Sequence, residues 1–166
     1  VIFVRAQIEL IENIFSKGEV SEIWITFPDP QIKYKRNKHR LINIDYINRY
    51  KNILVQDGVI NLKTDSEFFH GYSIGLIQGM DHEIIYSNHD IYNRSGSPLE
   101  ATSIQTFYEN MFLDEKREGD ETPLHFIFFG REYAQSASVC VFGKATGETT
   151  ESFDKPACIT LHILAD

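Results

Sequence analysis

Two short polar segments carry side chains suited to chemistry on a nucleic-acid base. The first reads Phe27-Pro28-Asp29-Pro30 and leads through Lys33 into a basic run from Lys35 to Arg40. The second reads Lys63-Thr64-Asp65. A pocket with carboxylates at its floor and cations at its rim suits a base together with its phosphate, because the cations neutralise the phosphate. Asp29 and Asp65 are therefore the first candidates for a functional site.

Apolar patterns place each polar segment directly after a strand. Alternating or continuous apolar residues predict strands over residues 20–27 and 59–63. Helical spacing predicts helices over residues 8–15, 44–54 and 67–78, with Gly58 capping the second and Thr64, Asp65 or Ser66 capping the third. Ligands of open α/β sheets bind beyond the carboxyl ends of the strands, so Asp29 and Asp65 should face one crevice.

The rest of the chain continues the alternation of strands and helices, and its composition changes beyond Gly130. Patterns predict a strand at 82–87, a helix at 99–113 and a strand at 124–129, which together with the earlier elements indicate an α/β sheet. Beyond Gly130 the chain is rich in Ser, Ala, Gly and Thr, with further strands expected at 139–142 and 159–164. We therefore divide the chain into a domain over residues 1–130 and a tail over residues 131–166 of unassigned role.

Charge is distributed unevenly along the 166 residues. The net charge of −8 argues against a protein that coats nucleic acid indiscriminately, because its overall field repels phosphate. Five of the sixteen Lys and Arg residues nevertheless fall between Lys33 and Arg40, with His39 among them. This clustering indicates a local phosphate contact.

The sequence gives no indication of a membrane span, a signal peptide or a metal site. The longest apolar runs fall far short of the ~20 residues of a membrane span, and the N-terminus lacks the pattern of a signal peptide, so we expect no membrane contact and a cytoplasmic location. Cys140 and Cys158 have no metal-ligand spacing, and we expect two free thiols and no metal site. The residues give no signal for an oligomeric state.

Each candidate residue also has a purely structural interpretation. Asp29 between two prolines is a natural turn former, and Lys63-Thr64-Asp65 is a common strand end and helix cap. Thr106 and Glu109 have capping-box spacing, although the segment from Ser97 to Glu100 offers a better box with Pro98 at the first helical position. For the basic run, the structural alternative to a phosphate contact is a solvated loop.

Three ordered motifs give the stretch from Glu19 to Phe112 a resemblance to the bacterial tRNA (guanine-N7)-methyltransferases. The family pattern is a strand ending in Phe-x-Asp-Pro-Trp-Pro-Lys before basic residues, then a strand ending in Lys-Thr-Asp, then Thr-x-Tyr-Glu on a late helix. Here these read Phe27 to Lys33, Leu62 to Asp65, and Thr106-Phe107-Tyr108-Glu109. The intervals between the motifs match as well, which makes the combination specific.

The resemblance implies a fold and a set of roles. The fold would be a Rossmann-like class I S-adenosylmethionine-dependent methyltransferase, and the parent would methylate N7 of a guanine in the tRNA variable loop. Asp29 would be the catalytic residue, at the junction of the S-adenosylmethionine and base pockets, and Gln7 stands where the family usually has a cofactor-binding Asp. The tRNA substrate would contact Lys33, Asp65, Thr106 and Glu109, and its backbone would contact Lys35, Arg36, Lys38, His39 and Arg40.

The chain departs from the family pattern in three places. It lacks the glycine-rich loop after the first strand of the fold and the acidic residue after the second, so the N-terminal strands and the cofactor half are missing and the chain is interpreted as a fragment. Gln31 and Ile32 replace the usual Trp-Pro pair. A missing half would leave a strand edge exposed, and one hypothesis is that a strand of the tail pairs with that edge.

The expected chemistry needs few groups. Guanine N7 has an unprotonated lone pair at neutral pH, so the site must position it in line with the methyl group and stabilise the cationic product ring with carboxylates. The main alternative is a non-catalytic RNA-binding module derived from a methyltransferase. A methyltransferase-like nucleotide-binding protein with another substrate is the third possibility.

Overall fold

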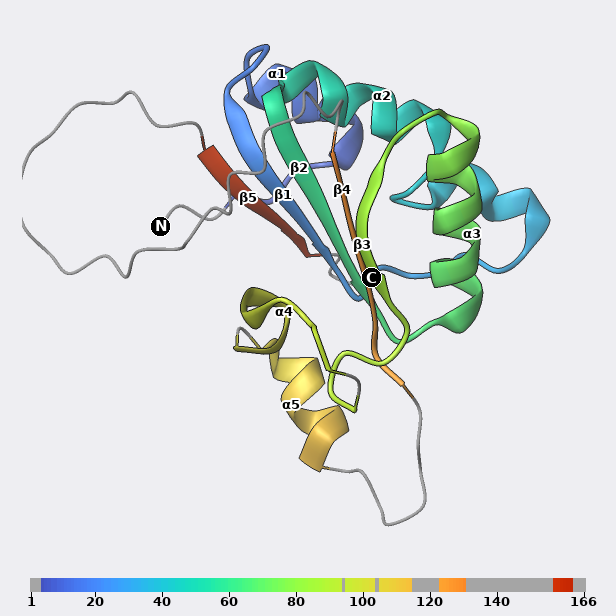
Figure 1. The fold of residues 1–166 in the computed structure, drawn as a ribbon. Coiled ribbons are helices and arrows are strands. Elements are labelled where there is room, and N and C mark those ends of the chain that lie inside the picture. Colours follow the sequence, from blue (N-terminus) through green and yellow to red (C-terminus); the bar gives the residue numbers. More distant parts are fainter. Residues whose placement is uncertain (1–3, 94, 104, 115–122, 131–156, 163–166) are drawn as a thin grey trace, which may run out of the picture.

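The computed structural model describes residues 4–93, 95–103, 105–114, 123–130 and 157–162. Within this part of the chain, five strands form one sheet in the order β3-β4-β2-β1-β5 (Figure 1). The strands are β1 (Val20–Thr26), β2 (Leu54–Thr64), β3 (Ile84–Asn88), β4 (His125–Gly130) and β5 (Ala157–His162).

The central strands share a carboxyl edge. β1 lies parallel to both neighbours, with Thr26 opposite Lys63 of β2 and opposite His162 of β5. β4 is antiparallel to β2, and β3 is antiparallel to β4. The predicted α/β class is confirmed, and so is the hypothesis that a strand of the tail pairs with the free edge of β1. The candidate strand at 139–142 lies outside the described residues.

Helices cover one face of this sheet (Figure 1). They are α1 (Ile11–Ile14), preceded by the 3-10 turn η1 (Ile8–Leu10), then α2 (Ile44–Ile53) and α3 (Glu67–Gly79). Side chains alternate across a strand, so Ile23 and Ile25 of β1 face these helices and join Ile47, Tyr50 and Phe69 in the main core. The helical layer therefore fixes the strands whose ends carry the candidate site.

Side-chain caps set where two helices begin. The Asn43 side chain accepts a hydrogen bond from the Tyr46 amide at 2.9 Å and starts α2. The Ser66 hydroxyl accepts one from the Phe69 amide at 3.2 Å and starts α3, as one of the three caps predicted for this helix. Asp65 is thereby held between the end of β2 and the first turn of α3.

Two short helices, α4 (Leu99–Ser103) and α5 (Phe107–Asp114), lie at the end of the sheet toward which β1 and β2 run (Figure 1). The prediction of one helix over 99–113 is wrong. The chain starts a second helix at Thr106, whose hydroxyl accepts from the Glu109 amide at 3.2 Å while the Glu109 carboxylate accepts from the Thr106 amide at 3.1 Å. This reciprocal capping box satisfies the amides that a helix start leaves without partners.

The assignment of Gly58 as a helix cap is also wrong. α2 ends at Ile53, and Gly58 lies buried inside β2, where the pairing with β1 jumps from Leu54 to Val59. A Cβ atom at Gly58 would lie 2.8 Å from Leu54 Cδ2 and 3.0 Å from the Val55 carbonyl oxygen. Glycine is required here by the close approach of the chain to itself.

Replacing Gly58 with alanine should lower the free energy of unfolding by about 1–3 kcal/mol, because the new methyl group overpacks against the buried Leu54. Gly71 provides the matched control: it lies exposed inside α3, and a Cβ atom there would meet no other atom within 4 Å, so alanine should stabilise by about 0.5–1 kcal/mol. Urea unfolding of both variants measures the difference. Equal stabilities would contradict the close approach at Gly58.

Candidate functional site

The loop after β1 has an unusual backbone that the Asp29 side chain supports. Phe27 and Gln31 have φ angles of 49° and 44°, in the left-handed region that non-glycine residues rarely occupy. The Asp29 carboxylate accepts hydrogen bonds from the Gln31 amide at 2.9 Å and from Gln31 Nε2 at 2.8 Å. Asp29 is exposed, so its carboxylate both shapes the loop and faces solvent at the carboxyl edge.

The end of β2 lies directly beside this loop. The Phe27 amide donates to the Lys63 carbonyl at 2.8 Å, which extends the β1–β2 pairing one residue past β1. Asp65, two residues past Lys63, is exposed at the same edge. The structure therefore brings the segments of Asp29 and Asp65 to adjoining strand ends.

Arg40 fastens the β1 loop to the start of α3. Its guanidinium donates to the carbonyl oxygens of Pro30, Gln31 and Ile32 at 3.1–3.4 Å. The same group lies over the rings of Phe68 and Tyr72, at 5.1 and 4.3 Å from their centroids. Arg40 is only 6% exposed, so the structure assigns it a clamping position under the loop.

The rest of the basic run lies at the surface. Residues Tyr34–His39 form the 3-10 helix η2. The exposed basic residues on and beside it are Lys33, Lys35, Arg36, Lys38 and His39. Arg36 also reaches back to the Gln31 side chain, with Nη1 3.5 Å from Oε1. These five side chains are placed where a phosphate backbone can approach them.

A buried ionic cluster joins β2 to α4 and α5. Lys63 Nζ lies 2.5 Å from Glu109 Oε1 and donates to the Ala101 carbonyl at 2.6 Å. The Tyr92 hydroxyl donates to the same Glu109 oxygen. The side chains of Lys63 and Glu109 are 1% and 0% exposed. Burial lowers the pKa of Lys63 and raises that of Tyr92, and Glu109 counteracts the change at Lys63.

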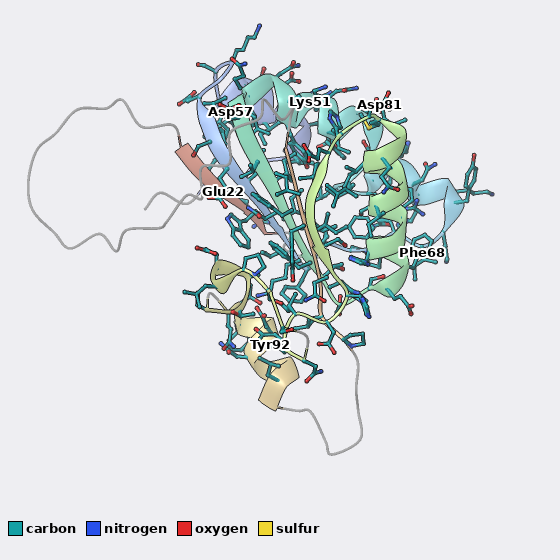
Figure 2. The ribbon with its side chains drawn as sticks, in the orientation of Figure 1. Glu22, Lys51, Asp57, Phe68, Asp81 and Tyr92 are labelled. Atoms are coloured by element: carbon teal, nitrogen blue, oxygen red, sulfur yellow. The ribbon has the colours of Figure 1, made fainter. Side chains whose placement is uncertain are left out.

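Thr106 and Glu109, expected to contact substrate, therefore have structural partners. Thr106 is half-buried at the start of α5, and Glu109 is held by Lys63, Tyr92 and the Thr106 amide. Figure 2 places Tyr92 beside α5, at the end of the sheet where this cluster lies. Thr106 and Glu109 lie at the same end of the sheet as Asp65. Unlike the exposed Asp65 carboxylate, the Glu109 carboxylate is enclosed by protein groups.

Gln7 lies in a different setting. It is exposed and precedes η1, and the neighbouring Glu9 accepts a hydrogen bond from the Tyr46 hydroxyl of α2 at 2.9 Å. Its segment is thus anchored to the helical layer, whereas Asp29 lies in the loop after β1.

Two stacked histidines lie next to the site, behind the end of β2. The rings of His70 on α3 and His125 on β4 have centroids 4.7 Å apart, and His125 pairs with Thr64 in the sheet. Burial lowers the pKa of His70 to about 4, and the charge of His125 acts in the same direction. Burial also lowers the pKa of His125.

Acid should therefore destabilise the fold before its carboxylates titrate. A histidine with an ordinary pKa near 6.5 in the unfolded chain and about 4 in the fold is neutral in both states at pH 7. As the pH falls below 6.5 the unfolded chain binds the proton first, so His70 alone should remove about 2 kcal/mol between pH 7 and pH 5. Urea unfolding at both pH values measures this loss, and His70→Gln should reduce it. An unchanged pH dependence in that variant would contradict the assignment.

Sequence patterns do not reveal three parts of this site. Lys63 stands out in the sequence only as part of a motif, although a lysine inside an apolar strand signals a buried partner. Arg40 looks like one of the surface cations, and its carbonyl partners become visible only in three dimensions. Tyr92 lies in a turn-rich segment without a motif.

The described residues contain neither a group of His, Cys, Asp and Glu side chains suited to a metal ion nor a helix long and apolar enough to cross a membrane.

The loops after the two central strands contain no glycine over residues 27–43 and 65–70. The sheet is an open α/β sheet, a class in which ligands bind in the crevice outside the carboxyl ends of the strands.

Comparison with known proteins narrows this class. Residues 1–121 match a family model described as "Putative methyltransferase". A tRNA (guanine-N(7)-)-methyltransferase of Christiangramia forsetii is 60% identical over 129 residues, which cover 78% of this chain and 55% of that protein. Proteins of the same description from Bacteroides thetaiotaomicron and Porphyromonas gingivalis are 43% and 42% identical, each over 69% of this chain and over 44% and 46% of their own lengths.

The chain belongs to this methyltransferase family, and its sheet is part of a Rossmann-like methyltransferase fold. The resemblance drawn from the three motifs is thereby confirmed. The chain spans about half the length of the curated relatives it matches.

Proposed function

We propose that the protein containing this fold transfers a methyl group from S-adenosylmethionine to N7 of a guanine in the variable loop of tRNA. The observation that carries the proposal is the Arg40 clamp, which holds the Asp29 loop against α3 and presents the basic helix η2 beside it. The descriptions of the relatives supply the substrate. We place the reaction in the cytoplasm, the compartment of bacterial tRNA.

The residues at the carboxyl edge fit the substrate side of this reaction. Guanine N7 needs no general base because its lone pair is unprotonated, so the protein must orient the base and stabilise its developing positive charge. The exposed carboxylates of Asp29 and Asp65, on adjoining strand ends, are placed to do this. Lys33, which is exposed at the end of the same loop, would bind the phosphate of the target nucleotide.

The loops after β1 and β2 lack one feature expected of a cradle for S-adenosylmethionine. Its adenosine and carboxylate groups are usually held by a glycine-rich turn, and the segments after β1 and β2 have no glycine. When bound, the cofactor would supply an electrophilic methyl group. Asp29 and Gln7 remain the two candidates from this chain for contacts with it.

Charge reversal on η2 should weaken tRNA binding by this chain. Lys35→Glu combined with Arg36→Glu should lower affinity at least about tenfold at physiological salt, because each lost phosphate contact removes counterion release. The slope of log Kd against log salt should decrease by about 0.7–0.9 per contact. Lys17→Glu with Lys51→Glu is the matched control, since Lys17 precedes β1 and Figure 2 shows Lys51 at the end of the sheet opposite Tyr92.

Unchanged affinity after reversal on η2, or an equal loss in the control, would instead favour the interpretation as a methyltransferase-like protein with another substrate.

A chimera tests the methyl transfer itself. Residues of the Christiangramia forsetii relative that match this chain would be replaced by those of the chain, and transfer of a labelled methyl group to unmodified tRNA would be measured. We expect activity within about tenfold of the parent relative, because the matching residues are 60% identical. A folded chimera that binds tRNA without transferring the label would favour the non-catalytic RNA-binding module.

A further inference from the structure

Tyr34 presents an aromatic ring to solvent in the middle of the basic segment. It is 85% exposed, the highest value among the large hydrophobic side chains of the described residues. Ile32, two residues earlier, is 66% exposed. Single exposed apolar residues are common on proteins, so the meaning of Tyr34 depends on its surroundings.

The charged residues around Tyr34 in the sequence are all cationic. The sequence has no acidic residue between Asp29 and Asp45, although the whole chain carries a net charge of −8. Lys33 and Lys35 flank Tyr34 directly, and Arg36 and Lys38 are further exposed cations of the same segment. A ring flanked by cations is the combination that binds single-stranded nucleic acid, since bases stack on the ring and phosphates pair with the charges.

The segment that carries the ring is fixed in place. η2 is closed by hydrogen bonds from the Arg36 amide to the Lys33 carbonyl at 2.8 Å and from the Arg40 amide to the Asn37 carbonyl at 3.1 Å. The Asn43 side chain donates to the Lys38 carbonyl at 2.9 Å. A segment that is already ordered loses less conformational entropy on binding than a flexible loop does.

The Arg40 contacts link this segment to the carboxyl edge of the sheet. Arg40 follows η2 directly and binds both the loop after Asp29 and the rings of α3. In Figure 1 the light-blue segment that contains η2 protrudes beside α3, and Figure 2 labels Phe68 on that helix. The ring therefore lies on an extension of the loop that carries Asp29, and the Arg40 contacts hold this extension against α3.

We propose that Tyr34 is a stacking platform for an unpaired RNA base, held there while Lys33, Lys35 and Arg36 bind the adjoining phosphates. The inference rests on the proposed tRNA methyltransferase function and deepens it, because it makes an unpaired stretch of the substrate the element that the basic segment recognises. Bases inside a duplex are stacked on each other and cannot reach the ring, so the platform selects RNA with unpaired nucleotides.

An anionic lipid surface is the competing partner for an exposed ring among cations. Helices that lie in a membrane interface bury a continuous apolar face, whereas this segment offers only Ile32 and Tyr34. The small apolar area and the density of charge favour RNA.

The test measures binding of the full chain to a single-stranded RNA of about 12 nucleotides that contains 2-aminopurine, and to the corresponding duplex. Stacking on the ring quenches the 2-aminopurine fluorescence. Tyr34→Ala and Tyr34→Leu should weaken single-strand binding by about 5- to 100-fold and abolish the quenching, because a stacked base contributes roughly 1–3 kcal/mol. Tyr34→Phe should stay within about twofold of the parent, since it keeps the ring.

Salt dependence separates stacking from charge. Tyr34→Ala should leave the slope of log Kd against log salt unchanged, whereas Lys35→Ala should decrease it by about 0.7. A Tyr34→Leu variant that binds like the parent, a Tyr34→Phe variant that fails to bind, equal losses on single strand and duplex, or tighter binding to phosphatidylglycerol vesicles than to RNA would each overturn the proposal.

The same variants in the chimera keep the two proposals apart. If the chimera methylates tRNA and Tyr34→Leu leaves the KM for tRNA unchanged, the stacking platform is wrong and the proposed function stands. If the chimera transfers no methyl group but the chain still binds single-stranded RNA in a Tyr34-dependent way, the methyl-transfer function fails and the platform stands.

Discussion

Replacing Lys63 with methionine is expected to lower the free energy of unfolding by about 3–5 kcal/mol. The substitution conserves volume but leaves the fully buried Glu109 without its counter-cation and the Ala101 carbonyl without its donor. Removing one partner of a buried ion pair is costly because the remaining charge has lost its water and gains no other neutralising group. Chemical denaturation of the parent and the variant measures the difference.

A second substitution shows whether the loss comes from the pair. Lys63→Met combined with Glu109→Gln removes both charges, and much of the stability should return, since a buried pair replaced by neutral residues is often close to neutral. Arg49→Ala is the control at the surface, where Arg49 and Glu12 form a pair at 2.9 Å with about a third of each side chain exposed, and should cost less than about 1 kcal/mol. Equal losses for Lys63→Met and Arg49→Ala would contradict the buried cluster.

Replacing Asp29 with alanine in the chimera is expected to lower kcat for methyl transfer by about 100-fold, the typical cost of losing one group that stabilises developing charge. Alanine also removes the acceptors of the Gln31 amide and side chain, which support the left-handed backbone of the loop. The variant therefore tests charge and loop shape together, and a second variant is needed to separate them.

Asp29→Asn separates the two roles, because its side-chain oxygen still accepts from the Gln31 amide while the negative charge is lost. If the carboxylate stabilises the product ring, Asp29→Asn should lose nearly as much kcat as Asp29→Ala, with the Tm of the parent. If Asp29 only forms the turn, Asp29→Asn should be as active as the parent, and its proposed catalytic role would be wrong. Single-turnover rates with labelled methyl donor give the comparison.

Local patterns are enough to predict the framework of this fold. Continuous apolar residues such as Ile23 and Ile25 mark a buried strand, and a polar segment directly after each strand places Asp29 and Asp65 at the same edge. The cap of α3 is among the three residues predicted, because Ser, Thr and Asp all accept hydrogen bonds from a helix start. Elements of this kind depend on neighbours in the sequence, which a pattern records.

The parts that differ from prediction depend on contacts between distant segments or on competing local signals. Ser97 to Glu100 offers a good helix start, but Thr106 and Glu109 form a second one, and the chain uses this second start because the Glu109 carboxylate also binds Lys63 from β2. Arg40 looks like its neighbours in the sequence, yet it is buried under carbonyl oxygens of the preceding loop. Gly58 follows a helical pattern and is required by the packing of Leu54 instead.

The most direct test of the proposed function is the identity of the nucleoside that the chimera modifies. Unmodified tRNA would be incubated with the chimera and S-adenosylmethionine, digested to nucleosides and fragments, and analysed by mass spectrometry. The proposal predicts 7-methylguanosine, located in the variable loop and formed about 100-fold more slowly when Asp29 is replaced with asparagine. Label in another nucleoside, or no label from a folded chimera whose parent is active, would contradict it.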